Sequence, residues 1–113
     1  MSSLVVSLDY DGTFSDNPVL WSDVVRVLAL AGAKVVCISN RIDTEENRML
    51  LRSHLPDAVE TVICCGALSK ANAAFSNSIN VDVWIDDNPA RIKNVADRVR
   101  RGFTSYRRTA TRG

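Results

Sequence analysis

The sequence predicts one α/β domain in which helices cover both faces of a parallel sheet. Its 113 residues suffice for one hydrophobic core, and 46% hydrophobic with 24% charged residues is ordinary for a globular protein. Short apolar runs, typical of buried strands, alternate along the chain with longer helix-like segments. Strands that are almost wholly apolar indicate a parallel sheet buried on both faces. We therefore expect a Rossmann-like three-layer α/β/α sandwich with about five parallel strands.

The first strand and helix are predicted between residues 4 and 32. Residues 4–8 form an apolar run of strand length, and residues 34–39 (KVVCIS) form a second one. Between them, Asn17-Pro18 is typical of a helix start and Gly32 of a helix end. The apolar residues expected on the buried face of this helix are Leu20, Val24, Val27, Leu28 and Ala31.

The later elements follow the same alternation. Acidic residues early and basic residues late in the second helix match the helix dipole, and His54 is expected at its end with no part in chemistry. In chain order we predict a helix over 44–55, a strand over 60–65, a helix over 68–77, a strand over 81–85, a helix from Asn88-Pro89 to about residue 99, and a short edge strand over 102–106.

Charge is distributed unevenly along the chain. Residues 1–97 hold all 13 acidic residues but only eight of the 14 basic ones, for a net charge of −5, whereas residues 98–113 hold six arginines and no acid. We assign residues 1–106 to the domain and 107–113 to a basic C-terminal tail. Clustered arginines near Phe103 and Tyr106 suit weak contact with a nucleic acid, and a solvated terminus is the alternative.

Other features argue against a secreted or membrane protein. No apolar run approaches the length that spans a bilayer, and the N-terminus lacks the basic region and cleavage site of a signal peptide, so we expect a cytoplasmic protein without membrane contact. Cys37, Cys64 and Cys65 lie in apolar runs without zinc-site spacing, which predicts buried, reduced thiols.

Polar residues directly follow three of the predicted strands. The first strand runs into Asp9-Tyr10-Asp11-Gly12-Thr13, the second ends at Ser39-Asn40-Arg41, and the fourth ends at Asp86-Asp87. Ligands of parallel sheets bind at the carboxyl ends of the strands, so these side chains are expected to converge. Clustered carboxylates repel one another unless a cation lies among them, and oxygen ligands without His or Cys favour Mg²⁺.

This residue set suits phosphoryl transfer. A carboxylate such as Asp9, held against magnesium, can attack a phosphoryl group to give an aspartyl-phosphate that water later hydrolyses. Asp11 can protonate the leaving oxygen and then deprotonate the water. Gly12 allows a sharp turn beside the ligand, while the Ser39 hydroxyl and the Lys70 ammonium can bind the transferring oxygens.

The four motifs resemble those of the haloacid-dehalogenase-like (HAD) hydrolase superfamily, in its phosphatase branch. An apolar strand followed by D-x-D-G-T matches residues 4–13, a Ser closing the next strand matches Ser39, a helical lysine matches Lys70, and paired acids match Asp86-Asp87. The motifs come in the family's order and span residues 4–89.

The resemblance implies a role for each matching residue. Asp9 is the implied nucleophile, Asp11 the general acid/base, Ser39 a hydrogen-bond partner of the phosphoryl group, and Lys70 the group that neutralises it. The implied Mg²⁺ ligands are Asp9, Asp11 (through its backbone carbonyl), Asp86 and Asp87. We expect Asp87 to bind the ion directly, with Asp86 beside it or in the outer sphere.

Further residues near the motifs are candidates for substrate binding. They are Gly12, Thr13, Asn40 and Arg41, and for Arg41 a surface salt bridge is an equal alternative. Two departures from the family pattern stand out: Phe14 replaces a Leu or Val, and no acid follows the fourth motif, since Asn88 to Arg91 come next.

The spacing leaves no room for the cap domain that many relatives insert. The resemblance therefore implies a capless, open site, unless a neighbouring subunit of a homo-oligomer covers it. The predicted function is a magnesium-dependent phosphomonoesterase acting on a nucleotide, a nucleic-acid terminal phosphate or a small phosphometabolite. The alternative is a catalytically weak binding module for phosphate-bearing or nucleic-acid ligands, although the four implied catalytic residues are all present. Transfer to an acceptor other than water stays open.

Overall fold

Four strands form an all-parallel sheet. They are β1 (Val5–Leu8), β2 (Lys34–Ser39), β3 (Val59–Cys64) and β4 (Val83–Ile85), in the spatial order β3-β2-β1-β4. Val6 of β1 pairs with Val35 of β2 and with Val83 of β4. The computed structural model describes residues 3–92, so the predicted strand over 102–106, most of the last predicted helix and the tail over 107–113 lie outside it. The α/β class and the parallel sheet are confirmed, with four strands in the described range.

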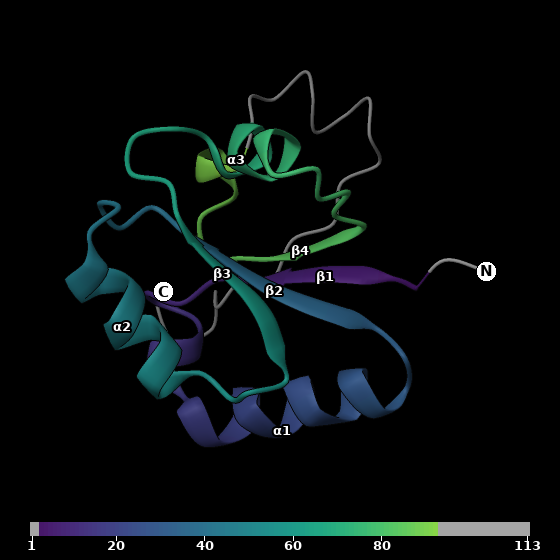
Figure 1. Ribbon diagram of the computed structural model, residues 1–113. Coiled ribbons are helices and arrows are strands. Elements are labelled where there is room, and N and C mark those ends of the chain that lie inside the picture. Colours follow the sequence, from purple (N-terminus) through teal and green to yellow (C-terminus); the bar gives the residue numbers. More distant parts are fainter. Residues whose placement is uncertain (1–2, 93–113) are drawn as a thin grey trace.

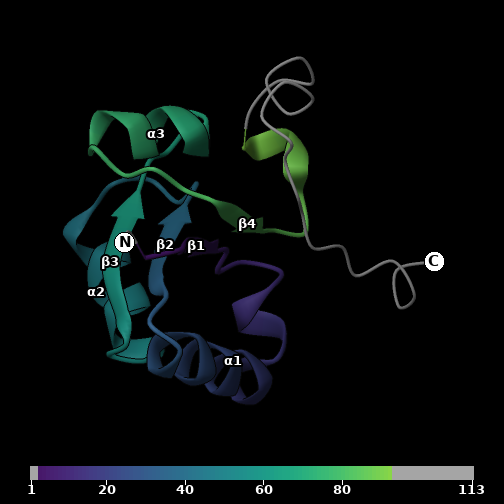
Figure 2. The same ribbon diagram turned by 90° about the vertical axis from the view of Figure 1, so that its right-hand side faces the viewer.

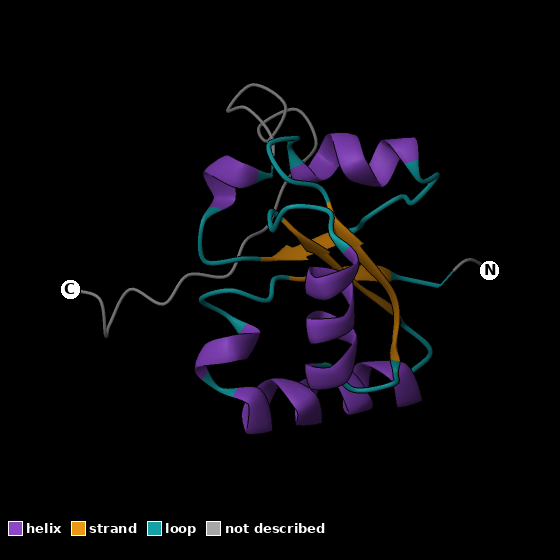
Figure 3. Cartoon of the chain, turned by 60° about the vertical axis from the view of Figure 1, so that its left-hand side comes forward, coloured by secondary structure: helices purple, strands orange, loops and turns teal. Residues whose placement is uncertain are grey.

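Helices lie on both faces of this sheet (Figures 1 and 2). The helices are α1 (Pro18–Leu30), α2 (Glu45–His54) and α3 (Lys70–Ser76), with 3-10 turns η1 (Phe14–Asp16) and η2 (Pro89–Arg91). One hydrophobic cluster contains Val35 and Cys37 of β2 together with residues of α1 and α2, and the other contains Val36 and Ile38 with residues of α3. Alternate residues of β2 thus pack into the two hydrophobic clusters, because successive side chains of a strand point to opposite faces of the sheet. Figure 3 shows the strands between the two helix layers.

The helix ends follow the predicted local signals. The Asn17 side chain accepts a hydrogen bond from the Leu20 backbone N–H, and Pro18 occupies the first turn. Gly32, with a φ of 92°, ends α1 through backbone hydrogen bonds to the preceding turn. Thr44 caps α2 and Ser69 caps α3 in the same way as Asn17.

The buried face of α1 differs from the predicted one. Trp21 and Val25 are buried and Val24 and Leu28 are partly buried, whereas Leu20 is 48% and Val27 64% exposed and Ala31 is exposed. The helix is rotated so that the large ring of Trp21, which removes the most apolar area from water, faces the sheet. The prediction was right for Val24 and Leu28 and wrong for the other three positions.

Two smaller expectations can be compared with the structure. After Asn88, the described chain forms the 3-10 turn η2, and the continuation of the predicted helix lies beyond residue 92. Cys37 and Cys64 are buried free thiols, as predicted, while Cys65 is half-buried. Within residues 3–92, no helix has both the length and the apolar character needed to cross a bilayer.

The strand order creates a switch point beside β1. From β1 the chain adds β2 and then β3 on one side, and it later returns to place β4 on the other side. The carboxyl ends of β1 and β4 therefore lie next to each other, with connections leaving in opposite directions. Ligands of open α/β sheets bind at such a point. Asp9 follows β1 there, and Asp86 and Asp87 follow β4.

Candidate active site

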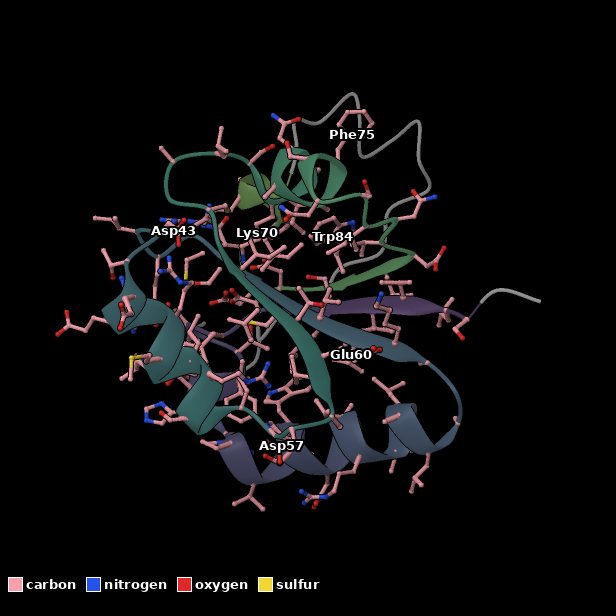
Figure 4. All side chains as sticks on the ribbon, viewed as in Figure 1. Asp43, Asp57, Glu60, Lys70, Phe75 and Trp84 are labelled. Atoms are coloured by element: carbon pink, nitrogen blue, oxygen red, sulfur yellow. The ribbon has the colours of Figure 1, made fainter. Side chains whose placement is uncertain are left out.

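The strand ends enclose a polar cavity of about 320 Å³. Lys70 projects into it from the first turn of α3, and Figure 4 labels this side chain between α3 and the sheet. The cavity is lined by Asp9, Asp11, Ser39, Asn40, Arg41, Lys70, Asp86, Asp87, Asn88 and Arg91. Eight of these ten residues are predicted site residues, so the structure brings the motifs of four separate segments together.

Lys70 forms the centre of a buried ion-pair cluster. Its ammonium Nζ lies 2.7 Å from Oδ1 of Asp9 and 2.5 Å from Oδ2 of Asp86. Asp86 also accepts a hydrogen bond at its other oxygen from the Asn88 backbone N–H, at 2.9 Å. All three charged side chains are almost fully buried. The Lys70 ammonium is thus held between the carboxyl ends of β1 and β4.

Burial shifts the pKa values of this cluster. Desolvation raises the pKa of Asp9 to about 7, and the charge of Asp86 adds to the rise while Lys70 opposes it. For Lys70, burial alone would lower the pKa, but the charges of Asp9 and Asp86 outweigh burial and raise it. Lys70 therefore stays charged at neutral pH, and one ammonium does not fully compensate the carboxylates around it.

The carboxylates at this edge fit a divalent cation. Asp9, Asp86 and Asp87 each offer one oxygen, and these oxygens lie within 4.8 Å of one another. Hard oxygen ligands of this type suit Mg²⁺ or Ca²⁺. Both oxygens of Asp86 already accept hydrogen bonds, from Lys70 and from the Asn88 backbone N–H. The carboxylate of Asp87 is therefore more available to a metal ion than that of Asp86. This favours Asp87 over Asp86 as a direct ligand.

Gly12 and Thr13 lie next to the carboxylates of the site, outside the cavity lining. The φ of Gly12 is 83°, a left-handed conformation that favours glycine, and a Cβ at this position would lie 2.4 Å from Oδ2 of Asp87. Thr13 is fully buried, and its hydroxyl donates to Oδ2 of Asp9 at 3.2 Å. Neither residue lines the cavity. Thr13 instead holds Asp9, and Gly12 leaves space for the Asp87 side chain. Their predicted substrate contacts stay a prediction.

Ser39 and Asn40 shape the end of β2. The buried Ser39 hydroxyl accepts a hydrogen bond from the Arg41 backbone N–H at 3.1 Å. The Asn40 amide donates to the backbone carbonyls of Gly66 and Leu68, both at 3.0 Å, which ties β2 to the loop before α3. The Asn40 Oδ1 atom is buried and accepts no hydrogen bond from the described residues. Asn40 therefore stabilises the loop that precedes Lys70.

Arg41 pairs with Asp11. Its Nε and one terminal nitrogen donate to the two carboxylate oxygens of Asp11, both at 2.9 Å, and the same guanidinium also donates to Asn47. These hydrogen bonds with Asp11 raise the pKa of Arg41. The Asp11 side chain is 53% exposed, so the pair lies at the mouth of the site. Of the two roles left open for Arg41, the structure shows a salt bridge, made with the implied acid/base itself.

Sequence reasoning missed four residues around this site. The Tyr10 hydroxyl lies 2.5 Å from Nδ1 of His54 at the end of α2, and the Arg41 guanidinium lies 5.5 Å from the centre of the Tyr10 ring. Asn88 and Arg91 line the cavity. The Asn88-Pro89 pair carried only a helix-start signal. No local pattern distinguishes Tyr10 or His54, because their contact joins distant segments, and Arg91 follows the fourth motif without a signal of its own.

No protein-family model matches the chain, and neither a curated protein nor a solved structure matches it. The site is therefore interpreted from the side chains that line the cavity. Its distinguishing features are three clustered carboxylates, a buried lysine bonded to two of them, and an arginine paired with a fourth acid at the mouth.

Proposed function

We propose that this protein is a magnesium-dependent phosphomonoesterase of the HAD type that acts through an aspartyl-phosphate on Asp9. The observation that carries the proposal is the placement of the Lys70 ammonium between Asp9 and Asp86, with Asp87 close enough to share a cation with both. A structural ion pair would need one carboxylate. Three clustered carboxylates, two of them paired with the same ammonium, leave negative charge that favours a divalent cation. That cation and Lys70 together would attract the negative phosphoryl group.

The finer fold belongs to the same proposal: five strands in a Rossmann-like three-layer sandwich without a cap. The supporting features are the helices on both faces and the short connections around the site. Residues 9–17 join β1 to α1 through one 3-10 turn, and only α2 lies between β2 and β3. The fifth strand expected from the sequence, over residues 102–106, lies outside the described residues.

Asp9 is the proposed nucleophile. Its Oδ1 is held by Lys70 and its Oδ2 by the Thr13 hydroxyl, so the carboxylate is fixed in orientation before a substrate arrives. In the first half-reaction a carboxylate oxygen bonds to phosphorus as the bond from phosphorus to the leaving oxygen breaks. Lys70 and Ser39 would bind the oxygens of the transferring group, where negative charge must be neutralised.

Asp11 is the proposed general acid/base. It would give a proton to the leaving oxygen in the first half-reaction. In the second it would take a proton from the water that attacks phosphorus, which releases inorganic phosphate and restores Asp9. Arg41 donates hydrogen bonds to both carboxylate oxygens of Asp11. Proton transfer therefore requires Asp11 to turn away from Arg41 when substrate enters.

Asp9, Asp87 and the backbone carbonyl of Asp11 would hold the magnesium ion, with Asp86 in support. When bound, the ion supplies positive charge that compensates the carboxylates and the phosphoryl oxygens. The substrate class we propose is a nucleotide, a nucleic-acid terminal phosphate or a small phosphometabolite.

The proposal is tested by phosphate release from a panel of monoesters, including nucleotides, sugar phosphates and DNA ends with 3′-phosphates. Each is measured with Mg²⁺ and with EDTA for the wild type and for Asp9→Asn. We expect Mg²⁺-dependent release that falls at least about a thousandfold in Asp9→Asn, as for loss of a nucleophile. Asp57→Asn is the matched control, because Asp57 is exposed, lies outside the cavity and undergoes the same chemical change.

Three outcomes separate the candidates. Phosphate release that persists in Asp9→Asn would show that Asp9 is not the nucleophile. Absence of release from every compound, together with a Mg²⁺-dependent rise in melting temperature, favours the binding module. Absence of both effects rejects the metal site as well.

A further inference from the structure

Three cationic side chains line the cavity, and two of them have anionic partners. Lys70 is bound to Asp9 and Asp86. Arg41 is bound to both oxygens of Asp11 and to Asn47. Arg91, in η2, lines the same cavity but makes no side-chain hydrogen bond or ion pair with any residue between 3 and 92. The Arg91 guanidinium is therefore the cavity cation that remains available to a ligand.

Arg91 takes no part in the ion-pair cluster at the proposed reaction centre. It follows Asp87 by only four residues, yet its guanidinium lies beyond ion-pair distance of Asp9, Asp86 and Asp87. The transferring phosphoryl group must touch Asp9. Arg91 is therefore not engaged in holding these carboxylates, and a cavity of about 320 Å³ exceeds what one phosphate group requires, so it has room for a second group of the same ligand.

Charge also favours a second anionic group on that ligand. Asp9, Asp86 and Asp87 would be balanced by Lys70 together with a divalent cation, and Asp11 is balanced by Arg41. The charge of Arg91 is then left without compensation. An arginine offers five N–H donors in a planar fork that matches the oxygens of a carboxylate or a phosphate.

We propose that Arg91 binds a second anionic group of the substrate, so that the preferred substrates are phosphomonoesters with a carboxylate or another phosphate near the cleaved phosphate. This inference rests on the proposed function, since it assigns the cleaved phosphate to Asp9. It makes Arg91 a specificity-determining residue outside the four motifs.

Matched substrates test the inference. Glycerol 2-phosphate and 2-phosphoglycerate differ only in one carbon, which is a hydroxymethyl group in the first and a carboxylate in the second; 2,3-bisphosphoglycerate adds a second phosphate. Adenosine 3′-phosphate and adenosine 3′,5′-bisphosphate form a larger pair. For each compound, kcat/KM is measured in the wild type, Arg91→Gln, Arg91→Lys and Arg26→Gln. Arg26 is the control because it is an exposed arginine on α1, outside the cavity, so its loss changes net charge equally.

The expected result is selective. In at least one pair, Arg91→Gln lowers kcat/KM for the compound with the extra anion by about three- to tenfold, as for loss of a partly exposed charged contact, and changes its partner less than about twofold. Arg91→Lys recovers part of the loss, and Arg26→Gln has no selective effect. Equal losses on both members of every pair would mean that Arg91 serves the transferring phosphate, and no loss would mean that it binds nothing. Either result overturns the inference while leaving the proposed function intact.

A binding measurement covers the case in which no compound is hydrolysed. Dissociation constants for the same pairs are measured by calorimetry with Mg²⁺ in Asp9→Asn and in the double variant with Arg91→Gln. Selective weakening of the compounds with the extra anion supports the second subsite even if the proposed turnover fails. Equal affinities in the two proteins overturn the inference.

Discussion

The Lys70 ammonium lies 2.7 Å from Oδ1 of Asp9, although the two residues are 61 positions apart in the chain. Asp86 shares the same ammonium, and the three side chains are almost fully buried. Lys70 thus neutralises two buried carboxylates. Removing its charge destabilises the folded protein, because carboxylates without a counter-charge are poorly solvated in the interior. Stability and the proposed chemistry therefore rely on the same cluster.

Replacement of Lys70 by Met should destabilise the metal-free protein in a pH-dependent way. At pH 8, loss of the shared cation leaves two buried carboxylates, and the expected cost is roughly 3–5 kcal/mol, as for breaking a buried pair. At pH 5 the cost should be smaller, because the raised pKa of Asp9, about 7, lets it bind a proton. Thermal unfolding in EDTA at both pH values measures this, with Lys34→Met at the start of β2 as the control. Equal losses at both pH values would contradict the prediction.

Asp9→Asn should become more stabilising as pH rises in metal-free buffer. The folded-state pKa of Asp9 is raised from 3.8 to about 7, so the folded chain binds this proton more tightly than the unfolded chain. The stability from this group is fully present below about pH 4 and is lost as pH rises through 7. Asn does not ionise and escapes that loss. The melting temperature of the variant relative to the wild type should rise by roughly ten degrees between pH 5 and pH 8, as expected for a change of about 2–3 kcal/mol. A difference that stays constant with pH would exclude this origin.

Gly12→Ala should weaken binding of Mg²⁺, whereas Gly32→Ala should not. Both glycines have a positive φ, of 83° and 92°, so both variants carry a similar backbone strain of about 1 kcal/mol. A Cβ at Gly12 would lie 2.4 Å from Oδ2 of Asp87, while a Cβ at Gly32 meets nothing within 4 Å. We expect at least about a tenfold loss of Mg²⁺ affinity in Gly12→Ala alone, because Asp87 must move from the ligand cluster. Calorimetric titration of both variants with Mg²⁺ checks this, and equal affinities would argue against Asp87 as a ligand.

Tyr10→Phe should cost stability through one specific hydrogen bond. The variant keeps the ring that stacks on Phe14 and faces Arg41 but loses the contact between the hydroxyl and Nδ1 of His54. The expected loss is about 0.5–1.5 kcal/mol in the free energy of unfolding. Urea denaturation of Tyr10→Phe, His54→Ala and the double variant tests the link, and the double variant should lose less than the sum of the single ones. Strict additivity would show that the two side chains do not interact.

Local signals in the sequence were sufficient for the four strands and three helices of the described residues and for most residues of the cavity. Asn17, Thr44 and Gly32 mark helix ends through their own side chains or backbone freedom, and these signals need no distant partner. The motifs after β1, β2 and β4 converge because the carboxyl ends of neighbouring parallel strands share one edge of the sheet. Once the alternation of strands and helices was recognised, that convergence followed.

The tertiary structure alone decided which of these groups contact one another. The hydrogen bonds from Arg41 to Asp11 and between Tyr10 and His54 join segments whose spacing in the chain carries no signal. The place of Arg91 in the cavity wall had no local signal either. The buried face of α1 was likewise decided by how the Trp21 ring packs on the sheet. The physical reason is one of range: caps, turns and strand periodicity depend on a few neighbouring residues, whereas ion pairs and buried faces depend on the distance and orientation of elements that only the folded chain brings together.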